Sequence, residues 1–207
     1  MDKKKILKVV GIIVLVLVVI FLIHVIKKFI IITNLVNISE EYANKTNYVA
    51  LVSSLQNGNF NIAKSINKDG NSLTILKNYG KDNQEERGLI KYEKDNEKIA
   101  IMYTSQERVA IINQPVLAEI NIVTMFSTFN DFLTRLQLAV MSRISTDNVG
   151  NYLIELDNWK MWVEKDTGLV IREINGGVVT ERSYEFDNIK EKDIEKPDIS
   201  DCIIREN

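Results

Sequence analysis

The most uniform pattern in the chain is an apolar run near the N-terminus. Between Val9 and Ile26, sixteen of the eighteen residues are Val, Ile, Leu or Phe, and only Gly11 and His24 interrupt them. Eighteen helical residues at about 1.5 Å each extend roughly 27 Å, close to the roughly 30 Å hydrocarbon core of a bilayer. A helix packed in a soluble core normally keeps a polar face, and residues 9–23 have none. We therefore expect an uncleaved membrane-spanning helix.

A cleaved secretory signal peptide is the alternative for an apolar run at this place. Such a peptide has a shorter apolar region and small residues ahead of its cleavage point. No Ala precedes Ala43, and the single cysteine is Cys202. The sequence therefore shows neither a signal-peptidase site nor the lipobox of a lipoprotein.

The charges that flank the apolar run predict its orientation. Four lysines precede the run within residues 1–8, and Lys27 and Lys28 follow it. The positive-inside bias then places the N-terminus in the cytoplasm and the rest of the chain outside the cell membrane. We divide the chain into a cytoplasmic stub and transmembrane helix (1–28), an extracytoplasmic domain (29–199) and a C-terminal tail (200–207).

After the apolar run, the spacing of apolar residues is first helical and then alternating. Ile31, Leu35, Ile38 and Tyr42 recur at helical intervals, which predicts an amphipathic helix continuous with the anchor. From residue 48 the period is two, and two-residue turn sequences such as Asn57-Gly58 separate the segments. The pattern predicts a meander of about six antiparallel strands, over residues 48–56, 59–68, 72–78, 89–94, 98–105 and 108–113.

A second helical stripe interrupts the strands. Apolar side chains from Ile122 to Val140 recur with helical spacing and predict an amphipathic helix over 122–144. Four more strands are predicted behind it, over 152–157, 160–165, 169–175 and 178–186. In the last of them Tyr184 and Phe186 share one face and Glu181 and Glu185 the other, as in a sheet with one packed and one wet face.

This order of elements predicts an α+β fold. We expect the N-terminal transmembrane helix to be followed by an antiparallel curved sheet, or incomplete β-barrel, with one or two amphipathic helices packed on its concave face. The tail from Lys190 is charged and contains Pro197. We expect it to be loosely ordered except around Ile203 and Ile204.

Charge and cysteine content narrow the classes of function. Residues 1–32 contain six Lys and one Asp, a net +5, so residues 33–207 carry −2 − 5 = −7. An acidic domain of this kind disfavours nucleic acid as a partner. A single cysteine excludes an intramolecular disulfide, so the domain depends on its core for stability. Abundant Lys, Asn and Ile with two Pro are typical of an AT-rich bacterial genome.

Two stretches in the second half resemble the superfamily of periplasmic outer-membrane lipoprotein carriers and their Gram-positive relatives. One is Trp162–Arg172, WVEKDTGLVIR, an aromatic-led strand, a charged turn ending in Gly and a second strand. The other is Tyr184–Ile189, YEFDNI, a late strand with an aromatic pair. The N-terminal helix leading into Tyr48–Ala50 is also similar to theirs. The resemblance spans roughly residues 31–199.

The resemblance implies a fold and a ligand class. Members of this superfamily form an incomplete antiparallel barrel whose concave apolar face is lidded by helices and holds acyl chains. The chain departs from the carriers because it is tethered and lacks a lipobox. The carriers also place an arginine in the cavity, and here Arg87, Arg108 and Arg182 are all candidates for that position.

The soluble part lacks the residues of common catalytic sites. The only histidine is His24, inside the apolar run, which removes Ser-His-Asp and Cys-His catalysis and most zinc sites. Ser65–Lys68 matches the S-x-x-K pattern of penicillin-binding enzymes, but it stands at the end of a predicted strand without the partner motifs, and we interpret it as chance. We expect no enzyme activity, no metal and no cofactor.

The candidate site is an apolar cavity or its lid. Its expected residues are Met125, Phe126, Phe129, Phe132, Leu136, Trp162, Tyr184 and Phe186. The helix predicted over 122–144 is either a lid over an acyl-binding concavity or fixed core, and the pattern leaves both open. Two functions follow. One is a membrane-anchored binding module for a lipid or lipoprotein acyl chain in the bacterial cell envelope. The other is a ligand-free structural or signalling domain that contacts an envelope protein.

Overall fold

The computed structural model describes residues 3–81, 84–113 and 129–205. Its helices are α1 (Lys3–Ala43), α2 (Phe132–Met141) and the short 3₁₀ helix η2 (Glu191–Asp193). Its strands are β1 (Tyr48–Gln56), β2 (Asn59–Lys68), β3 (Asn71–Tyr79), β4 (Glu85–Lys94), β5 (Glu97–Thr104), β6 (Arg108–Ile112), β7 (Arg143–Thr146), β8 (Tyr152–Leu156), β9 (Trp159–Val163), β10 (Val170–Asn175), β11 (Val178–Phe186) and β12 (Ile203–Arg205).

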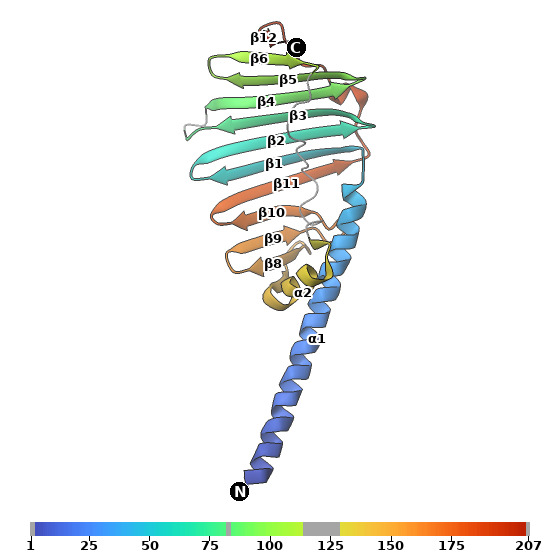
Figure 1. The fold of residues 1–207 in the computed structure, drawn as a ribbon, viewed down its shortest axis with the longest axis vertical. Coiled ribbons are helices and arrows are strands. Elements are labelled where there is room, and N and C mark those ends of the chain that lie inside the picture. Colours follow the sequence, from blue (N-terminus) through green and yellow to red (C-terminus); the bar gives the residue numbers. More distant parts are fainter. Residues whose placement is uncertain (1–2, 82–83, 114–128, 206–207) are drawn as a thin grey trace.

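The twelve strands of the described residues form one sheet in the order β12-β6-β5-β4-β3-β2-β1-β11-β10-β9-β8-β7 (Figure 1). Neighbours are antiparallel except for β12 and β6, which pair in parallel. The edge strands β12 and β7 do not pair with each other, so the sheet is open and does not close into a barrel. The fold is therefore α+β, with a long apolar N-terminal helix, a large open sheet of mainly antiparallel strands and one further short α-helix.

The strand predictions are confirmed in number and order for the ten expected strands, because their turns are strongly specified. In the hairpin at Asn57-Gly58, for example, both turn residues have positive φ (52° and 83°), as a two-residue turn of the twist-compatible type requires. The prediction of a helix continuing to residue 144 is wrong. The helix ends at Met141, and residues 143–146 form the short edge strand β7.

The beginning of α2 also differs from the prediction. Asp131 is the N-cap in an extended conformation, and its side chain accepts a hydrogen bond from the Thr134 backbone N–H. Helix α2 therefore starts at Phe132. Residues 122–128, where the prediction placed the first part of this helix, lie outside the described residues.

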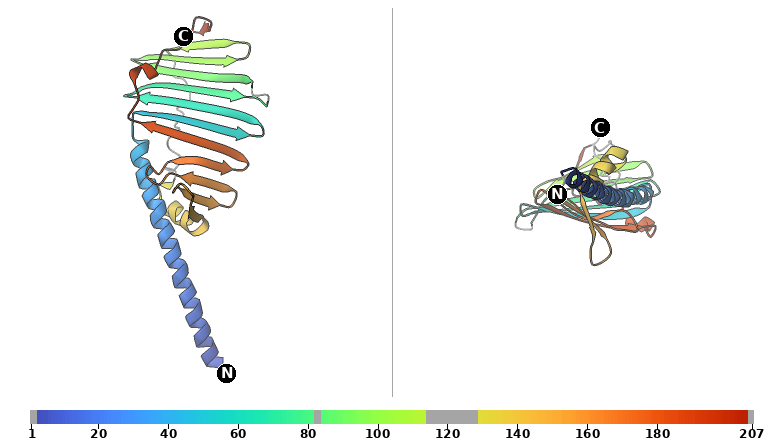
Figure 2. Two further views of the ribbon diagram at one scale, coloured as in Figure 1. Left: turned by 180° about the vertical axis from the view of Figure 1, so that it is seen from behind. Right: turned by 90° about the horizontal axis from the view of Figure 1, so that it is seen from below.

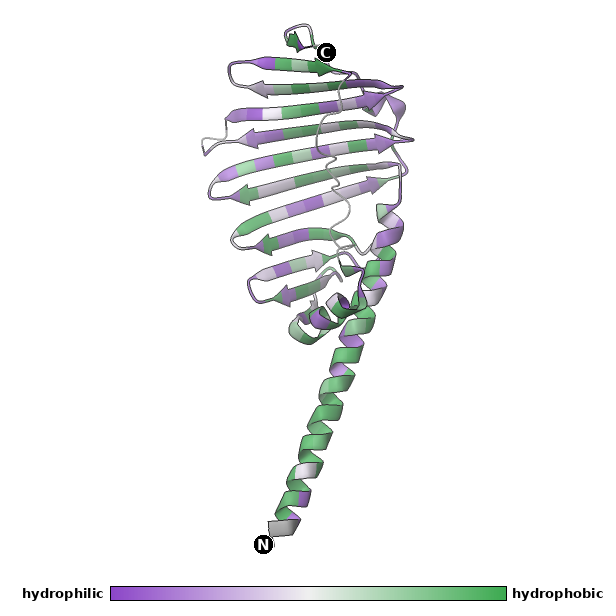
Figure 3. Cartoon of the chain, viewed as in Figure 1, coloured by the Kyte–Doolittle hydropathy of each residue, from purple (hydrophilic) through white to green (hydrophobic). Residues whose placement is uncertain are grey.

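Helix α1 is continuous through the predicted boundary between anchor and amphipathic helix. Every described side chain before Val25 is exposed, and the lower part of the helix is almost uniformly hydrophobic (Figure 3). From Val25 one stripe becomes buried, at Val25, Lys28, Ile32, Leu35, Val36 and Ser39. By length and composition, α1 is able to cross a membrane. Its second half is part of the folded domain.

Both helices pack on the same side of the sheet, which we call the helix face (Figure 2). Buried side chains of α1, among them Ile32 and Leu35, meet Leu138 and Ala139 of α2 and an apolar set from β8–β10. That set comprises Ile154, Met161, Val163 and Val170. The helix-packed core therefore occupies the β7–β10 end of the sheet.

Gly168 permits close packing of α1 on the sheet. It adopts φ +65°, and a Cβ atom placed there would lie 2.3 Å from the Leu35 carbonyl oxygen. Any side chain would therefore push the helix away from the turn before β10. The glycine of the charged turn described above thus has a packing role against α1.

The opposite side, the tail face, is covered by the C-terminal segment over β1–β6. Ile189 and Ile194 of this segment are buried against Ile66, Leu73, Tyr92, Ile99 and Ile101 of the strands. Lys196 pairs with Glu97 at 2.6 Å, and Arg108 pairs with Asp201. The tail is thus a packed strap ending in β12, rather than the loosely ordered segment expected from its charge.

Candidate functional site

The two faces of strands β1–β5 are built from different side chains. On the tail face one row across the strands is Val49, Ile66, Leu73, Tyr92 and Ile99. On the helix face the neighbouring row is Ala50, Ser65, Thr74, Lys91 and Ala100, which we call the small-residue row. Four of its five members have small side chains, and these four are each at most 9% exposed. On this part of the helix face, the small side chains are therefore buried.

A second helix-face row lies beside the first and is apolar. It consists of Val52, Ala63, Leu76, Leu89 and Met102. Met102 at its end is 46% exposed. The two rows cross the strands from β1 to β5. At about 4.8 Å between strands, they form a strip of roughly 19 Å.

A buried ion pair marks the end of this strip on β10 and β11. The Arg182 guanidinium donates to Glu173 Oε2 at 2.8 Å, and the Trp159 indole N–H donates to Glu173 Oε1 at 2.7 Å. The side chains of Arg182 and Glu173 are only 7% and 9% exposed. Arg182 is paired in register with Val52, so its charge stands in line with the apolar row. The site thus combines an apolar strip with a desolvated charged group at one end.

Tyr184 and Phe186 extend the helix face next to this pair. Their rings are stacked with centroids 6.4 Å apart, and Phe186 contacts Tyr42 of α1 edge-on at 5.0 Å. The Tyr184 hydroxyl donates to the Val170 carbonyl oxygen at 3.4 Å. Burial raises the pKa of Tyr184 to about 12, although the nearby Arg182 acts in the opposite direction, so the phenol is neutral at physiological pH.

The structure brings together some of the sequence-predicted site residues. Phe129 is buried on the helix face, where its ring lies 6.0 Å from that of Trp159, and Leu136 is half-buried in the same cluster. Phe132 touches Phe29 of α1 at 5.3 Å but is 63% exposed.

Trp162 lies apart from these residues. It pairs in register with Arg172 and Leu153 on the tail face, with the Arg172 guanidinium 5.1 Å from its ring. Met125 and Phe126 lie outside the described residues. The predicted set is therefore divided between the two faces, with Phe129, Leu136, Tyr184 and Phe186 on the helix face.

The three arginines named as cavity candidates have different environments. Arg108 is on the tail face with Asp201, and its pKa is raised chiefly by the hydrogen bond to that carboxylate. Arg87 is exposed near the beginning of β4. Arg182 alone among the three is buried on the helix face.

The Arg182–Glu173 pair was not predicted, although the turn between β10 and β11 indicates that the two side chains lie close together. A two-residue turn at Gly176-Gly177 places Glu173 opposite Thr180, and Arg182 is then two positions along on the same face. A carboxylate and a guanidinium on diagonal positions of one face are within reach of each other.

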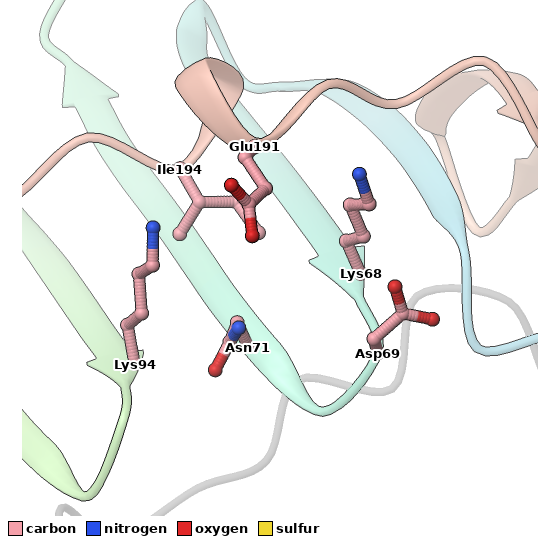
Figure 4. A pocket seen from close by; sticks show the side chains of 6 residues that line it. All are labelled: Lys68, Asp69, Asn71, Lys94, Glu191 and Ile194. Carbon is pink, nitrogen blue, oxygen red and sulfur yellow. The ribbon is translucent and has the colours of Figure 1, made fainter.

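Two recesses are lined by described residues, and both lie away from the helix face. One has a volume of about 40 Å³ and is lined by polar side chains of two hairpin ends and by η2. Figure 4 shows Lys68 and Lys94 on either side of Glu191 there. It is far smaller than the roughly 300 Å³ at which small-molecule sites begin. The other lies between β1 and β11 on the tail face and is open to solvent.

The S-x-x-K match does not form a catalytic pair. Ser65 belongs to the helix face, where its hydroxyl lies 3.3 Å from that of Thr74, whereas Lys68 lines the tail-face recess. Three residues apart on a strand, the two side chains point to opposite faces. Among the described residues, no three His, Cys, Asp or Glu side chains gather closely enough to hold a metal ion.

The comparisons with known proteins identify no family: no family model matches the chain, and no curated protein is similar to it in sequence.

Proposed function

We propose that the protein is a membrane-anchored module of the bacterial cell envelope that binds an apolar ligand, a lipid or a lipoprotein acyl chain, on the helix face of its sheet. In this proposal α1 is a single-pass anchor with its N-terminus in the cytoplasm and the sheet outside. The sheet acts as an incomplete barrel similar to that of lipoprotein carriers, and its concave side is the helix face.

The observation that carries the proposal is the difference between the two faces of β1–β5. A sheet face that forms an ordinary core carries large side chains, as the tail face does with Leu73, Tyr92 and Ile99. The helix face instead presents small side chains beside an apolar row. In the proposal, a flexible chain lies along this row of small side chains. Each methylene buried there would contribute about 0.8 kcal/mol.

The charged groups of this face favour an acyl chain with a polar end. Arg182 stands at one end of the strip and Lys91 within it, so a carboxylate, ester or phosphate oxygen has a cationic partner at either position. Arg182 already bonds Glu173, so a ligand oxygen there would join an existing network. A wholly apolar ligand would form no ion pair or hydrogen bond with Arg182 or Lys91.

The test is photochemical cross-linking in the full-length chain, because the second half of α1 is part of the core. The protein is placed in lipid nanodiscs with a fatty acid that carries a diazirine at its terminal carbon, irradiated, and mapped by peptide mass spectrometry. We expect adducts on helix-face residues of β1–β5 as well as on the exposed part of α1. Adducts confined to α1 would show that α1 contacts lipid while the helix face binds no acyl chain, which would contradict the proposal.

A matched pair of variants separates occupancy of the helix face from general affinity for lipid. Ala63→Phe places a large ring in the apolar row, and Lys64→Phe places the same ring on the tail face one residue away. Ala63→Phe is expected to abolish the β1–β5 adducts while those on α1 persist. Lys64→Phe is expected to leave both unchanged. Equal loss in both variants would contradict the proposed position of the ligand.

The second candidate function is a ligand-free structural or signalling domain. One observation favours it: α1 runs from the apolar segment into the domain core without a break, so movement of the span is transmitted directly to the sheet. This candidate predicts no helix-face adducts and the recovery of an envelope protein cross-linked to the sheet.

A further inference from the structure

Helix α2 carries an apolar stripe that no described part of the chain covers. Leu138 and Ala139 on one side of α2 are buried in the helix-face core. The other side exposes Phe132, Leu133, Val140 and Met141 by 63%, 72%, 45% and 62%, with Gln137 between them. We call this set the α2 stripe. Four large apolar side chains on ten helical residues form an exposed patch of the kind that marks a binding surface.

The position of α2 along α1 relates the stripe to the membrane. The rings of Phe132 and Phe29 are in edge-on contact at 5.3 Å, and Lys28 Nζ donates to the Ser142 carbonyl oxygen at 2.5 Å. Phe29 comes three residues after Ile26, the end of the apolar run, which is a rise of about 4.5 Å along the helix. The two ends of α2 are thus attached to α1 just beyond its apolar segment (Figure 1).

That height corresponds to the lipid headgroups. A bilayer of about 40–45 Å with a roughly 30 Å hydrocarbon core has an interfacial layer of about 5–8 Å on each side. If α1 spans the membrane with residues 9–26 in the core, Phe29 and Phe132 lie in this layer. An apolar helix side with cationic side chains near it is able to lie at the boundary between headgroups and acyl chains.

The charges around α2 agree with a lipid surface as the occupant. Residues 24–33 and 129–146 contain four cationic side chains and one acidic one, a net of 4 − 1 = +3, and Glu155, which lies opposite Arg143, is balanced by its ion pair with Lys160. The four cationic side chains are Lys27, Lys28, Arg135 and Arg143, against Asp131. Residues 33–207 as a whole carry −7. An anionic bilayer therefore attracts this end of an otherwise acidic domain.

We propose that the α2 stripe lies in the headgroup layer of the same bilayer that α1 crosses, so that the domain is held to the membrane by two contacts. This inference rests on the membrane-spanning part of the proposed function and is independent of any ligand on the helix face. Its occupant is lipid, and a second copy of the chain or another protein is an outcome that the test distinguishes.

The test is depth measurement by spin labelling of the full-length chain in vesicles of phosphatidylcholine and phosphatidylglycerol. In a Cys202→Ser background, single labels are placed through Leu133→Cys and Met141→Cys. Leu15→Cys, in the span, is the reference for hydrocarbon. Leu55→Cys, 48% exposed on β1, is the matched control for water. Accessibility to oxygen, which concentrates in lipid, is compared with accessibility to a water-soluble nickel chelate.

Labels at positions 133 and 141 are expected to show an oxygen-to-nickel accessibility ratio several-fold above that at position 55 and below that at position 15. A ratio equal to that at position 55 would overturn the docking while leaving the anchor intact. Shielding from both reagents would show that protein, not lipid, covers the stripe. A water-like label at position 15 would overturn the span and the docking together, whatever the cross-linking experiment finds.

Discussion

Removing one partner of the buried Arg182–Glu173 pair should destabilise the protein far more than removing both. Glu173→Leu leaves the Arg182 cation buried without this carboxylate, and breaking such a pair typically costs about 3–5 kcal/mol. Arg182→Met leaves the Glu173 anion with the Trp159 N–H as its remaining bonded partner, at a similar cost. Each single variant should therefore lower the free energy of unfolding by about 3–5 kcal/mol.

The double variant removes both desolvated charges. At 2.8 Å and an effective dielectric constant of about 20, the Coulomb attraction is roughly 6 kcal/mol, and desolvating each ion costs several kcal/mol. For the pair itself these terms largely cancel, and the Trp159 N–H that loses its acceptor adds a cost of about 1–3 kcal/mol. The double variant should thus be more stable than either single one.

Urea unfolding of the full-length chain in detergent micelles measures these differences. The two tryptophans supply the signal, and Trp159 touches the pair directly. Free energies are comparable only if the urea dependence is the same in all four proteins. Additive losses, with the double variant as unstable as the sum of the singles, would refute the reasoning. They would mean that each side chain acts through packing and not through the charge of the other.

Three further predictions follow from particular contacts. Gly168→Ala should lower the unfolding midpoint in urea, because the new Cβ meets the Leu35 carbonyl oxygen at 2.3 Å and φ is +65°. A chain that starts at residue 33 should unfold at lower urea than one that starts at residue 24, because it lacks the buried Val25, Lys28 and Ile32, and the loss of Ile32 alone costs about 2–5 kcal/mol. The Tyr103 hydroxyl is the main cause of the lowered pKa of Glu85. Wild type should therefore exceed Glu85→Gln in thermal stability at neutral pH, and the difference should vanish as the pH falls below the usual value of 4.5 through the folded-state pKa.

The strands and turns were predictable because local chemistry specifies them. A two-residue turn with Asn-Gly or Asp-Gly ends one strand, begins the next and sets their register, which is why the meander from β1 to β6 follows from the sequence. Strand β7 was not predictable in the same way. Its only apolar residue, Ile144, continues the helical spacing of α2, and four residues at a sheet edge show too little alternation to compete with it.

Long-range contacts explain the remaining differences. Strand β12 has three residues and pairs in parallel with β6, about a hundred positions earlier, and no local pattern encodes such a contact. The strap depends on isolated apolar residues such as Ile194 in a charged segment, whose burial comes from the sheet beneath. The sequence alone could have placed Trp162 on the other face from Met161 and Val163, because neighbouring residues of a strand point to opposite faces.

The unbroken course of α1 also has a mechanical consequence. A transmembrane helix changes its tilt when the bilayer becomes thinner or thicker. Twelve strands at about 4.8 Å give the sheet a reach of roughly 53 Å, so a 10° change in tilt would displace its far end by roughly 9 Å. If α1 spans a membrane as proposed, its unbroken course into the domain core would convert membrane thickness into the angle at which the far edge of the sheet, β12, meets its surroundings.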